Sequence, residues 1–337
     1  MKAVKWGIMS TANIALTQII PAINRASNAT VLAIASRSEE MAQNIAREYE
    51  IPKFYNRYED LLADPEIDAV YIPLPNHIHK KWAILAAKAG KHILCEKPIA
   101  LNVKEVEEIE KSCSKNKVFF MEAFMYQFHQ QHKRVKDILK NGELGTIKLM
   151  RASFTYNMTD RKTNIRMKKG MGGGAIYDIG CYCIHSIRTM LNAEPVSVQT
   201  FAEIDSKSGV DVSAIVHMKL NNNVDALFDC GFNMTFRNEY EIVGSEGVLK
   251  VPRAFRPDTE NGEGLLIIEK GDEVRTERII GDQYLNQIEY FSNCVINRTA
   301  PEYTLRNSSK NMKVIDAIYE SIRKNEEIVL NKHLLVC

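Results

Sequence analysis

Short apolar runs alternate with segments of helical spacing through the first 121 residues, and this alternation constrains the fold more than any other feature. The runs are Ala3–Met9, Val31–Ala35, Ala69–Ile72, His92–Cys95 and Val118–Met121. Apolar runs separated by helices are typical of parallel strands joined by right-handed crossovers. Gly90 ends one helical segment, where a helix C-cap is expected. The pattern predicts an α/β protein whose residues 1–122 form a Rossmann domain with a doubly wound parallel sheet.

After about residue 140 the pattern changes to one typical of antiparallel strands. The expected strands are Val212–Leu220, Val224–Gly231, Tyr240–Val243, Val248–Val251 and Leu265–Glu269. Two helical segments follow, at Gln283–Ile296 and Ser308–Arg323. We therefore expect residues 123–337 to form an α+β domain for substrate binding and oligomerisation, with a large, mostly antiparallel, open-faced sheet. The last helix, at about 308–323, is a candidate to pack back on the first domain.

Composition indicates an ordinary globular chain, with 45% hydrophobic and 26% charged residues. The 337 residues suit two domains, and 44 basic against 42 acidic residues give no overall attraction to nucleic acid or a membrane surface. No apolar run reaches the roughly 18–20 residues of a membrane span, and Ser10, Thr11 and Asn13 interrupt any signal peptide. The seven cysteines show no zinc spacing, so we expect reduced thiols, no metal and a cytoplasmic location.

The turn after the first strand has the form of a dinucleotide site without its glycines. Ser10, Ala12 and Ala15 occupy the three positions that require small residues for the turn, for phosphate approach and for helix packing. The N-terminus of the following helix offers N–H groups to phosphate. Small residues selected only for packing remain the alternative. The expected cofactor contacts here are Ser10, Thr11, Ala12, Asn13 and Ile14.

The end of the second strand favours NADP(H) over NAD(H). An NAD site requires Asp or Glu at this point for the ribose hydroxyls, and none precedes Glu39. Instead Arg37 lies between Ser36 and Ser38, a combination suited to a 2′-phosphate. Two alternatives stay open: Ser36 and Ser38 cap the next helix, or the site takes NAD(H).

Two loops that follow parallel strands carry further candidate residues. Ligands of such sheets bind at the carboxyl ends of the strands. The expected cofactor contacts in these loops are Pro73, Leu74, Asn76, His79, Glu96 and Lys97. In the second domain, Gly172–Gly174 precede a largely apolar helix on which Asp178, Tyr182 and His185 are spaced to share one face. Such a polar stripe requires partners, and a satisfied core network is the alternative to a site.

At these residues the chain resembles the Gfo/Idh/MocA oxidoreductases, through its Glu96–Pro98 tripeptide and the glycine run that leads to Asp178 and Tyr182. Within the family its motifs are most similar to dimeric dihydrodiol dehydrogenases and NADP-dependent D-xylose dehydrogenases. The resemblance implies that Lys97 is a catalytic or nicotinamide-site lysine, that Asp178 and Tyr182 face the substrate, and that the chain forms dimers or larger assemblies through its open sheet face. Free Tyr and Lys titrate too high for a general base near neutral pH, but a neighbouring ammonium lowers a tyrosine pKa. A Lys97–Tyr182 proton relay follows from these roles, in which Asp178 either orients the substrate or tunes Lys97.

Three further residues are candidate substrate contacts: Arg166, His185 and Phe124. Surface charge is the alternative for Arg166, and a hydrogen-bonded structural role is the alternative for His185. The chain departs from the family at Gln127, where many relatives carry arginine, and at Gln130, where proline is usual. The expected function is an NADP(H)-dependent oxidoreductase of a sugar, polyol or dihydrodiol. The alternatives are a non-catalytic NADP(H)-binding regulator and an NAD(H) enzyme of the same reaction type.

Overall fold

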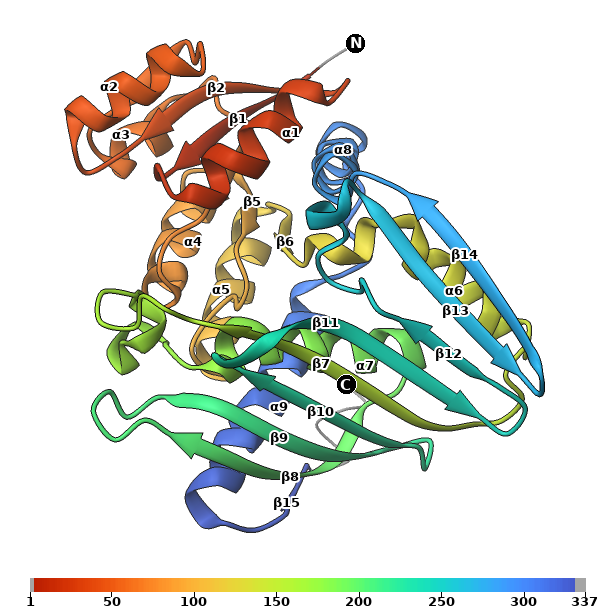
Figure 1. Ribbon diagram of the computed structural model, residues 1–337. Coiled ribbons are helices and arrows are strands. Elements are labelled where there is room, and N and C mark those ends of the chain that lie inside the picture. The colour runs from red at the N-terminus through yellow and green to blue at the C-terminus, as the bar shows by residue number, and fades with distance from the viewer. Residues whose placement is uncertain (1–2, 331–337) are drawn as a thin grey trace. The chain divides into compact units, whose positions relative to one another are not determined.

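A computed structural model describes residues 3–330 and divides the chain into two compact units (Figure 1). The first unit contains residues up to Met125 together with Tyr284–Ser309. The second contains Tyr126–Gln283 and, of the described residues, Lys310–Leu330. The sequence-based boundary assigned every residue after 122 to one domain, whereas Tyr284–Ser309 clusters with the first unit, and most of the last helix with the second.

The first unit is built on a six-stranded sheet of order β3-β2-β1-β4-β5-β6 in which every neighbouring pair is parallel. Its strands are β1 Val4–Met9, β2 Ala29–Ala35, β3 Lys53–Tyr55, β4 Ala69–Ile72, β5 His92–Cys95 and β6 Phe120–Glu122. Its helices are α1 Ile20–Arg25, α2 Glu39–Glu48, α3 Tyr58–Ala63, α4 His79–Lys88, α5 Val103–Asn116 and α8 Gln283–Asn297. Gly90 follows α4 with φ of 73°, so it ends that helix as expected. This is the doubly wound sheet that the sequence predicts.

Helix α8 joins this unit because the N-terminal sheet supplies partners for it. Trp6 on β1 is fully buried, and its Nε1 donates to Ser292 Oγ at 3.2 Å. Its ring lies 5.7 Å from that of Phe291, and Asn28 Nδ2 donates to the Glu289 carbonyl at 2.9 Å. A buried indole needs both apolar contact and an acceptor for its N–H. These contacts explain why a segment from the far end of the sequence packs on the first sheet.

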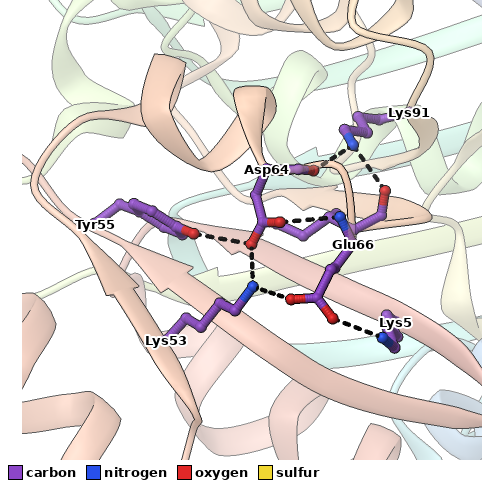
Figure 2. A network of polar contacts seen from close by, with 7 residues as sticks. Lys5, Lys53, Tyr55, Asp64, Glu66 and Lys91 are labelled. Carbon is purple, nitrogen blue, oxygen red and sulfur yellow. Dashed lines mark hydrogen bonds and ion pairs between the residues drawn. The ribbon is translucent and has the colours of Figure 1, made fainter.

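A network of polar side chains fixes the short edge strand β3 (Figure 2). The Asp64 carboxylate accepts from Lys53 Nζ at 2.9 Å and from Tyr55 Oη at 2.8 Å. Burial raises the Asp64 pKa, but hydrogen bonds from Lys53, the Glu66 N–H and Tyr55 outweigh it and lower that pKa to about 2. The buried Lys91 donates to the Asp64 and Ile67 carbonyls at 2.6 and 2.8 Å. The bonds from Lys53 and Tyr55 to Asp64 hold β3 in place, although none of the three residues of this strand is buried.

The second unit contains a nine-stranded sheet of order β14-β13-β12-β11-β7-β10-β9-β8-β15. The strands are β7 Ile147–Asn157, β8 Pro195–Ile204, β9 Asp211–Leu220, β10 Asp225–Gly231, β11 Asn233–Gly244, β12 Val248–Val251, β13 Glu263–Lys270, β14 Glu273–Ile280 and β15 Ile328–Val329. The helices are α6 Gln130–Lys140, α7 Cys181–Leu191 and α9 Leu305–Lys324. All strand pairs are antiparallel except β7 with β10, which is parallel. The α+β architecture with a mostly antiparallel sheet is therefore confirmed.

The two faces of this sheet differ in burial. One face is buried and apolar, with Met218 and Phe228 among its residues, and Figure 1 shows α7 and α9 on one side of the sheet. On the other face Phe201 and Ile215 are 61% and 59% exposed. These two residues are directly paired across β8 and β9. An open sheet face that carries large apolar side chains is typical of an interaction surface.

The structure also bears on the expected state of the cysteines and on the expected lack of a membrane span. The six cysteines among residues 3–330 are all buried, at Cys95, Cys113, Cys181, Cys183, Cys230 and Cys294; Cys337 lies outside the described residues. Small apolar core residues are the ordinary use of such cysteines. Among the described helices, none combines the length and apolar character needed to cross a membrane.

Candidate active site

The turn after β1 leads into an open helix start. Residues Ser10–Ala12 are half-exposed and Asn13 is exposed, so this turn is accessible. The Ala12 carbonyl accepts from the Ala15 and Leu16 N–H groups at 2.9 and 3.2 Å. The helix therefore begins at this turn, continues as a π-helical stretch over Ala15–Ile19 and passes into α1. Because the first N–H groups of a helix have no partners within it, they are suited to an anionic ligand.

The end of β2 separates the roles of the two serines and the arginine. Ser38 Oγ accepts from the Met41 N–H at 3.3 Å, so Ser38 is the N-cap of α2. Ser36 is buried, and its Oγ accepts from the Ser38 N–H at 3.3 Å. Arg37 is exposed between them. The capping alternative thus holds for Ser38 and leaves Arg37 as the available cation.

Tyr58 on α3 brings two of the predicted cofactor residues together. Burial raises the pKa of the Tyr58 phenol, whereas the nearby Arg37 charge and a hydrogen bond with Ser10 lower it. The Tyr58 ring also packs edge-on against Trp82 at 4.9 Å. The sequence analysis missed Tyr58, because nothing in its local pattern shows that α3 returns to the turn after β1.

His79 joins the loops that follow β4 and β5. It is fully buried, with Nε2 2.6 Å from the Leu74 carbonyl and Nδ1 2.9 Å from the Pro98 carbonyl. Burial lowers the His79 pKa to about 4. Lys97 is half-exposed next to Pro98, and Glu96 Oε1 accepts from Tyr71 Oη at 2.6 Å. These two predicted loops therefore form one connected region of the first unit, with His79 inside it.

Phe124 and the two family departures lie beyond β6. Phe124 is fully buried and packs edge-on against Tyr303 at 6.1 Å. Gln130 is the first residue of α6, capped by His129, whose side chain accepts from the Gln131 N–H. Proline is also tolerated at the first position of a helix, so the Gln130 departure leaves the fold intact. The effect of Gln127 on ligand contacts and the role of Phe124 toward substrate stay predictions.

In the second unit, Asp178 is the centre of a charged cluster. Its Oδ2 lies 2.7 Å from Arg166 Nε and accepts from Tyr156 Oη at 3.0 Å. The Asp178 side chain is 13% exposed, and the Asp178 carboxylate raises the pKa of the Arg166 guanidinium further above its ordinary value. Arg166, a predicted substrate contact with surface charge as its alternative, is thus an ion-pair partner of Asp178. Tyr156 lies on β7, a strand that the sequence pattern did not reveal.

The glycine run allows Arg166 and Asp178 to approach each other. The Gly174 N–H donates to the Arg166 carbonyl at 2.9 Å, and the Asp178 N–H donates to the Gly174 carbonyl at 3.1 Å. A Cβ at Gly173 would lie 2.4 Å from the Arg166 oxygen, closer than any side chain could tolerate. A π-helical stretch at Ile176–Gly180 then leads into α7.

Tyr182 lies in an aromatic pocket next to this cluster. It is 5% exposed, and its ring lies 5.4 to 5.9 Å from those of Phe154, Phe255 and Tyr126. The Arg166 charge also interacts with Tyr182. A nearby cation favours the phenolate form of a tyrosine. The Arg166 charge therefore acts on both Asp178 and Tyr182, two members of the predicted polar stripe.

His185 continues the stripe into the core. It is fully buried, its Nδ1 lies 2.5 Å from Tyr126 Oη, and its pKa is lowered well below the ordinary value by burial. Tyr126 contacts the rings of both Tyr182 and His185. Tyr126 thus connects His185 to Tyr182 in the core. Within residues 3–330, no group of three or more His, Cys, Asp or Glu side chains is arranged to hold a metal.

The first unit has the fold of dinucleotide-dependent enzymes, and comparisons with known proteins identify the family. Residues 4–124 match the oxidoreductase family with an NAD-binding Rossmann fold, and residues 132–250 match the GFO/IDH/MocA C-terminal domain. The chain belongs to this Gfo/Idh/MocA oxidoreductase family, as its motifs indicated.

Several relatives span most of the chain. It is 33% identical over 326 residues to D-xylose 1-dehydrogenase (NADP(+)) 2 of Haloferax volcanii, covering 97% of this chain and 99% of that enzyme. It is 32% identical over 255 residues to trans-1,2-dihydrobenzene-1,2-diol dehydrogenase of Xenopus tropicalis, covering 74% and 76%. A solved 3-ketoreductase from Actinomadura kijaniata, in complex with NADP and TDP-benzene, is 29% identical with a TM-score of 0.89, covering 95% and 98%.

Proposed function

We propose that this chain transfers a hydride between NADP(H) and a hydroxyl or carbonyl carbon of a sugar, polyol or dihydrodiol. The observation that carries the proposal is the cluster of Tyr182, Arg166 and Asp178 in the second unit. It provides a shielded phenol next to a permanent cation and a fixed carboxylate. A phenol in such surroundings is suited to give or take the proton that accompanies hydride transfer.

The residues of the first unit fit NADP(H). Arg37 is exposed beside the helix capped by Ser38, and both Arg37 and Ser10 act on Tyr58. A guanidinium there would bind the 2′-phosphate through charge-assisted hydrogen bonds, and the helix start after Ser10 would bind the pyrophosphate. The xylose dehydrogenase relative carries NADP(+) in its name, and the 3-ketoreductase structure holds NADP. The bound cofactor would supply or accept the hydride.

Tyr182 would move the proton. In the reducing direction the carbonyl oxygen of the substrate takes the phenolic proton as its carbon gains the hydride. In the oxidising direction the phenolate takes the hydroxyl proton back. Arg166 stabilises the phenolate by its charge, and its ion pair with Asp178 holds the guanidinium in position. The Asp178 carboxylate, bound by Arg166 and Tyr156, would orient a substrate hydroxyl.

Lys97 is the second group of the proposed relay. It follows Glu96 in the loop after β5, a loop that His79 holds against the one after β4. Its ammonium would polarise the substrate oxygen and stabilise the Tyr182 phenolate in the same way as Arg166. Lys97 belongs to the first unit and Tyr182 to the second, so their approach is part of the proposal.

The substrate class rests on what the relatives act on. The names of two relatives specify D-xylose and a dihydrobenzenediol, and the solved relative is a 3-ketoreductase. These compounds share a ring or chain with neighbouring oxygen-bearing carbons, one of which exchanges hydride. A carboxylate fixed by a guanidinium is suited to accept a hydrogen bond from the neighbouring hydroxyl. We therefore infer a vicinal hydroxyl or keto-hydroxyl compound.

A screen of cofactors and substrates tests the proposal. NADP⁺ or NADPH would be mixed with the chain and a panel of aldoses, polyols, inositols and dihydrodiols, with turnover read from nicotinamide absorbance. We expect turnover of at least one compound, with NADP(H) preferred. Binding of NADP(H) without turnover of any member would favour the regulator alternative, and a preference for NAD(H) would contradict the assignment of Arg37.

Two variants with matched controls test the residues. Lys97→Met and Tyr182→Phe should lower turnover by roughly 10²–10⁴-fold, the usual scale for a lost acid or base, while cofactor binding persists. Lys111→Met changes an exposed lysine on α5, and Tyr49→Phe changes a half-exposed tyrosine after α2. Both control variants should keep full activity. Full turnover in Lys97→Met would make that lysine structural.

We also propose that the chain forms a homodimer through the open face of the second sheet. Phe201 and Ile215 supply the exposed apolar area, and Arg151–Glu241 and Arg237–Asp229 are ion pairs on the same face. Phe201→Asp should give a monomer by light scattering at micromolar concentration, whereas Met41→Asp, at an exposed site in the first unit, should leave the dimer intact. A monomeric wild-type chain would contradict this interface.

The proposed location is the cytoplasm. The support is chemical: the six described cysteines are buried as small core residues, a use that suits a reducing compartment. Recovery of NADP(H)-dependent activity in the cytoplasmic fraction of gently lysed cells would agree, and recovery in an exported fraction would not.

A further inference from the structure

Asp211 is a buried carboxyl group that the proposed chemistry does not use. It begins β9 and is 2% exposed. Its Oδ2 accepts from the Ile176 N–H at 2.7 Å, and its Oδ1 accepts from Tyr319 Oη on α9 at 2.8 Å. A carboxyl group removed from water costs free energy unless hydrogen bonds compensate for the lost hydration. Its partners therefore indicate what it does.

Gly174 connects Asp211 to the proposed active site. Its φ is +120°, and a Cβ there would lie 2.1 Å from Asp211 Oδ1, so the carboxyl group occupies the space of a side chain. The same glycine donates its N–H to the Arg166 carbonyl and accepts from the Asp178 N–H through its own carbonyl. One residue thus touches Asp211 and is bonded to both members of the ion pair.

Tyr319 holds the other side of the same segment. Its ring lies 4.9 Å from that of Tyr177, the residue before Asp178. Because Tyr319 also donates to Asp211, the carboxyl group and the tyrosine together contact Gly174, Ile176 and Tyr177. These residues lie at the start of the helix that carries Tyr182.

We infer that Asp211, together with Tyr319, is a positioning residue that sets the start of this helix so that Asp178, Arg166 and Tyr182 keep their mutual geometry. Asp211 contacts none of the reacting atoms in this assignment; it acts through the Gly174 turn and the Ile176 N–H. The inference rests on the proposed oxidoreductase function. The geometry of the proposed site thus also depends on β9 and α9, which hold Asp211 and Tyr319 and contribute no reacting group.

The kinetic test compares Asp211→Ala and Asp211→Asn with the wild type at a temperature well below unfolding. Asp211→Ala should lower kcat by roughly 10–100-fold, because small displacements of a catalytic group carry large costs. Its NADPH dissociation constant should stay within about twofold, since the predicted cofactor residues lie in the first unit. Asp211→Asn keeps an oxygen acceptor for the Ile176 N–H and should recover most of the lost kcat. Wild-type kcat in a folded Asp211→Ala variant would overturn the inference.

Ser321→Ala is the matched control on α9. Ser321 is buried, donates to the Glu326 carbonyl at 2.7 Å and accepts from the Thr200 N–H at 3.0 Å, so its loss affects packing but not the Gly174 turn. If Asp211→Ala does not fold, Tyr319→Phe replaces it, with an expected fall in kcat of about threefold or more. An equal fall in Ser321→Ala would reduce the effect to general destabilisation and overturn the inference.

Amide hydrogen exchange separates this inference from the proposed function. Exchange of the segment 174–182 should rise in Asp211→Ala or Tyr319→Phe, and stay at the wild-type rate in Ser321→Ala. This readout needs no substrate. If the wild-type chain turns over no substrate but exchange is faster in Asp211→Ala, the proposed function is rejected and Asp211 remains the anchor of the Gly174 turn. If exchange is unchanged in both Asp211→Ala and Tyr319→Phe, the anchoring role of Asp211 is rejected.

Discussion

The stability of the second unit should depend on pH through Asp211 in the direction opposite to an ordinary surface carboxylate. Burial raises the pKa of Asp211 to about 6, against the lowering effect of the bonds from Ile176 and Tyr319. The ordinary value is 3.8. Between these two values the folded state holds the proton while the unfolded chain releases it. Because the folded state binds more protons there, the free energy of unfolding falls as pH rises.

The size of the effect follows from the displacement of the pKa. Integration of the proton-binding difference between about pH 4.5 and pH 7.5 gives a loss of about 2 kcal/mol from this one group. Other groups also titrate in this range, so the variant Asp211→Asn serves as the reference. The difference in unfolding free energy, wild type minus variant, should therefore decrease by about 2 kcal/mol from the lower to the higher pH.

Urea unfolding at the two pH values measures this difference. Trp6 and Trp82 both lie in the first unit, so tryptophan fluorescence follows that unit and far-UV circular dichroism is needed for the second. The tryptophan transition provides an internal control if the two units unfold separately. A double difference near zero, or one of opposite sign, would refute the assignment of Asp211 as a carboxyl group that is protonated more readily in the folded state.

Three further outcomes are expected. Arg37→Ala should weaken the binding of NADPH at least about 10-fold more than that of NADH in fluorescence titrations, because a charged contact contributes roughly 1.5–3 kcal/mol. Equal losses of affinity for the two cofactors would contradict the role of Arg37 in binding the 2′-phosphate. Asp64→Asn should destabilise the first unit at neutral pH by on the order of 1 kcal/mol, after allowance for the partly exposed Lys53. The loss of unfolding free energy should shrink as pH falls toward about 2, where the Asp64 carboxyl of the folded state is protonated. A loss that is independent of pH, measured by tryptophan fluorescence, would contradict the network. Arg166→Met should lower kcat by about 10-fold or more, since the Asp178 carboxylate loses its ion-pair partner; an unchanged kcat would separate Arg166 from the chemistry.

The sequence predicted the first unit well because its strands are buried on both faces. Val70 and Ile93, for example, lie in short continuous apolar runs, which are typical of parallel strands buried on both faces. It missed β3, whose three residues Lys53–Tyr55 are partly exposed and are held by the Asp64 network. A strand such as β3, which is defined by polar contacts, has no apolar signal to read. The sequence analysis also missed β7, in which buried Met150, Ala152 and Phe154 alternate with the more exposed Arg151 and Ser153.

The sequence also allowed candidate site residues to be identified where their spacing along one helix places them together. Asp178, Tyr182 and His185 could be grouped by their spacing alone, because a helix places such positions on one side. Their roles could not be divided in the same way. His185 is fully buried against Tyr126, whereas Asp178 is paired with Arg166, twelve positions earlier in the chain.

The sequence by itself thus determined the doubly wound first unit, the family motifs, the glycines required by a tight turn and the set of candidate side chains. Only the tertiary structure decided that Trp6 meets Ser292, that Tyr58 joins Ser10 to Arg37, and that Asp211 and Tyr319 hold the turn at Gly174. The physical reason is that backbone preference and apolar periodicity are local, whereas a buried polar group takes whatever partner the packing brings to it. Contacts of that kind connect residues far apart in the chain, and no pattern along the chain encodes them.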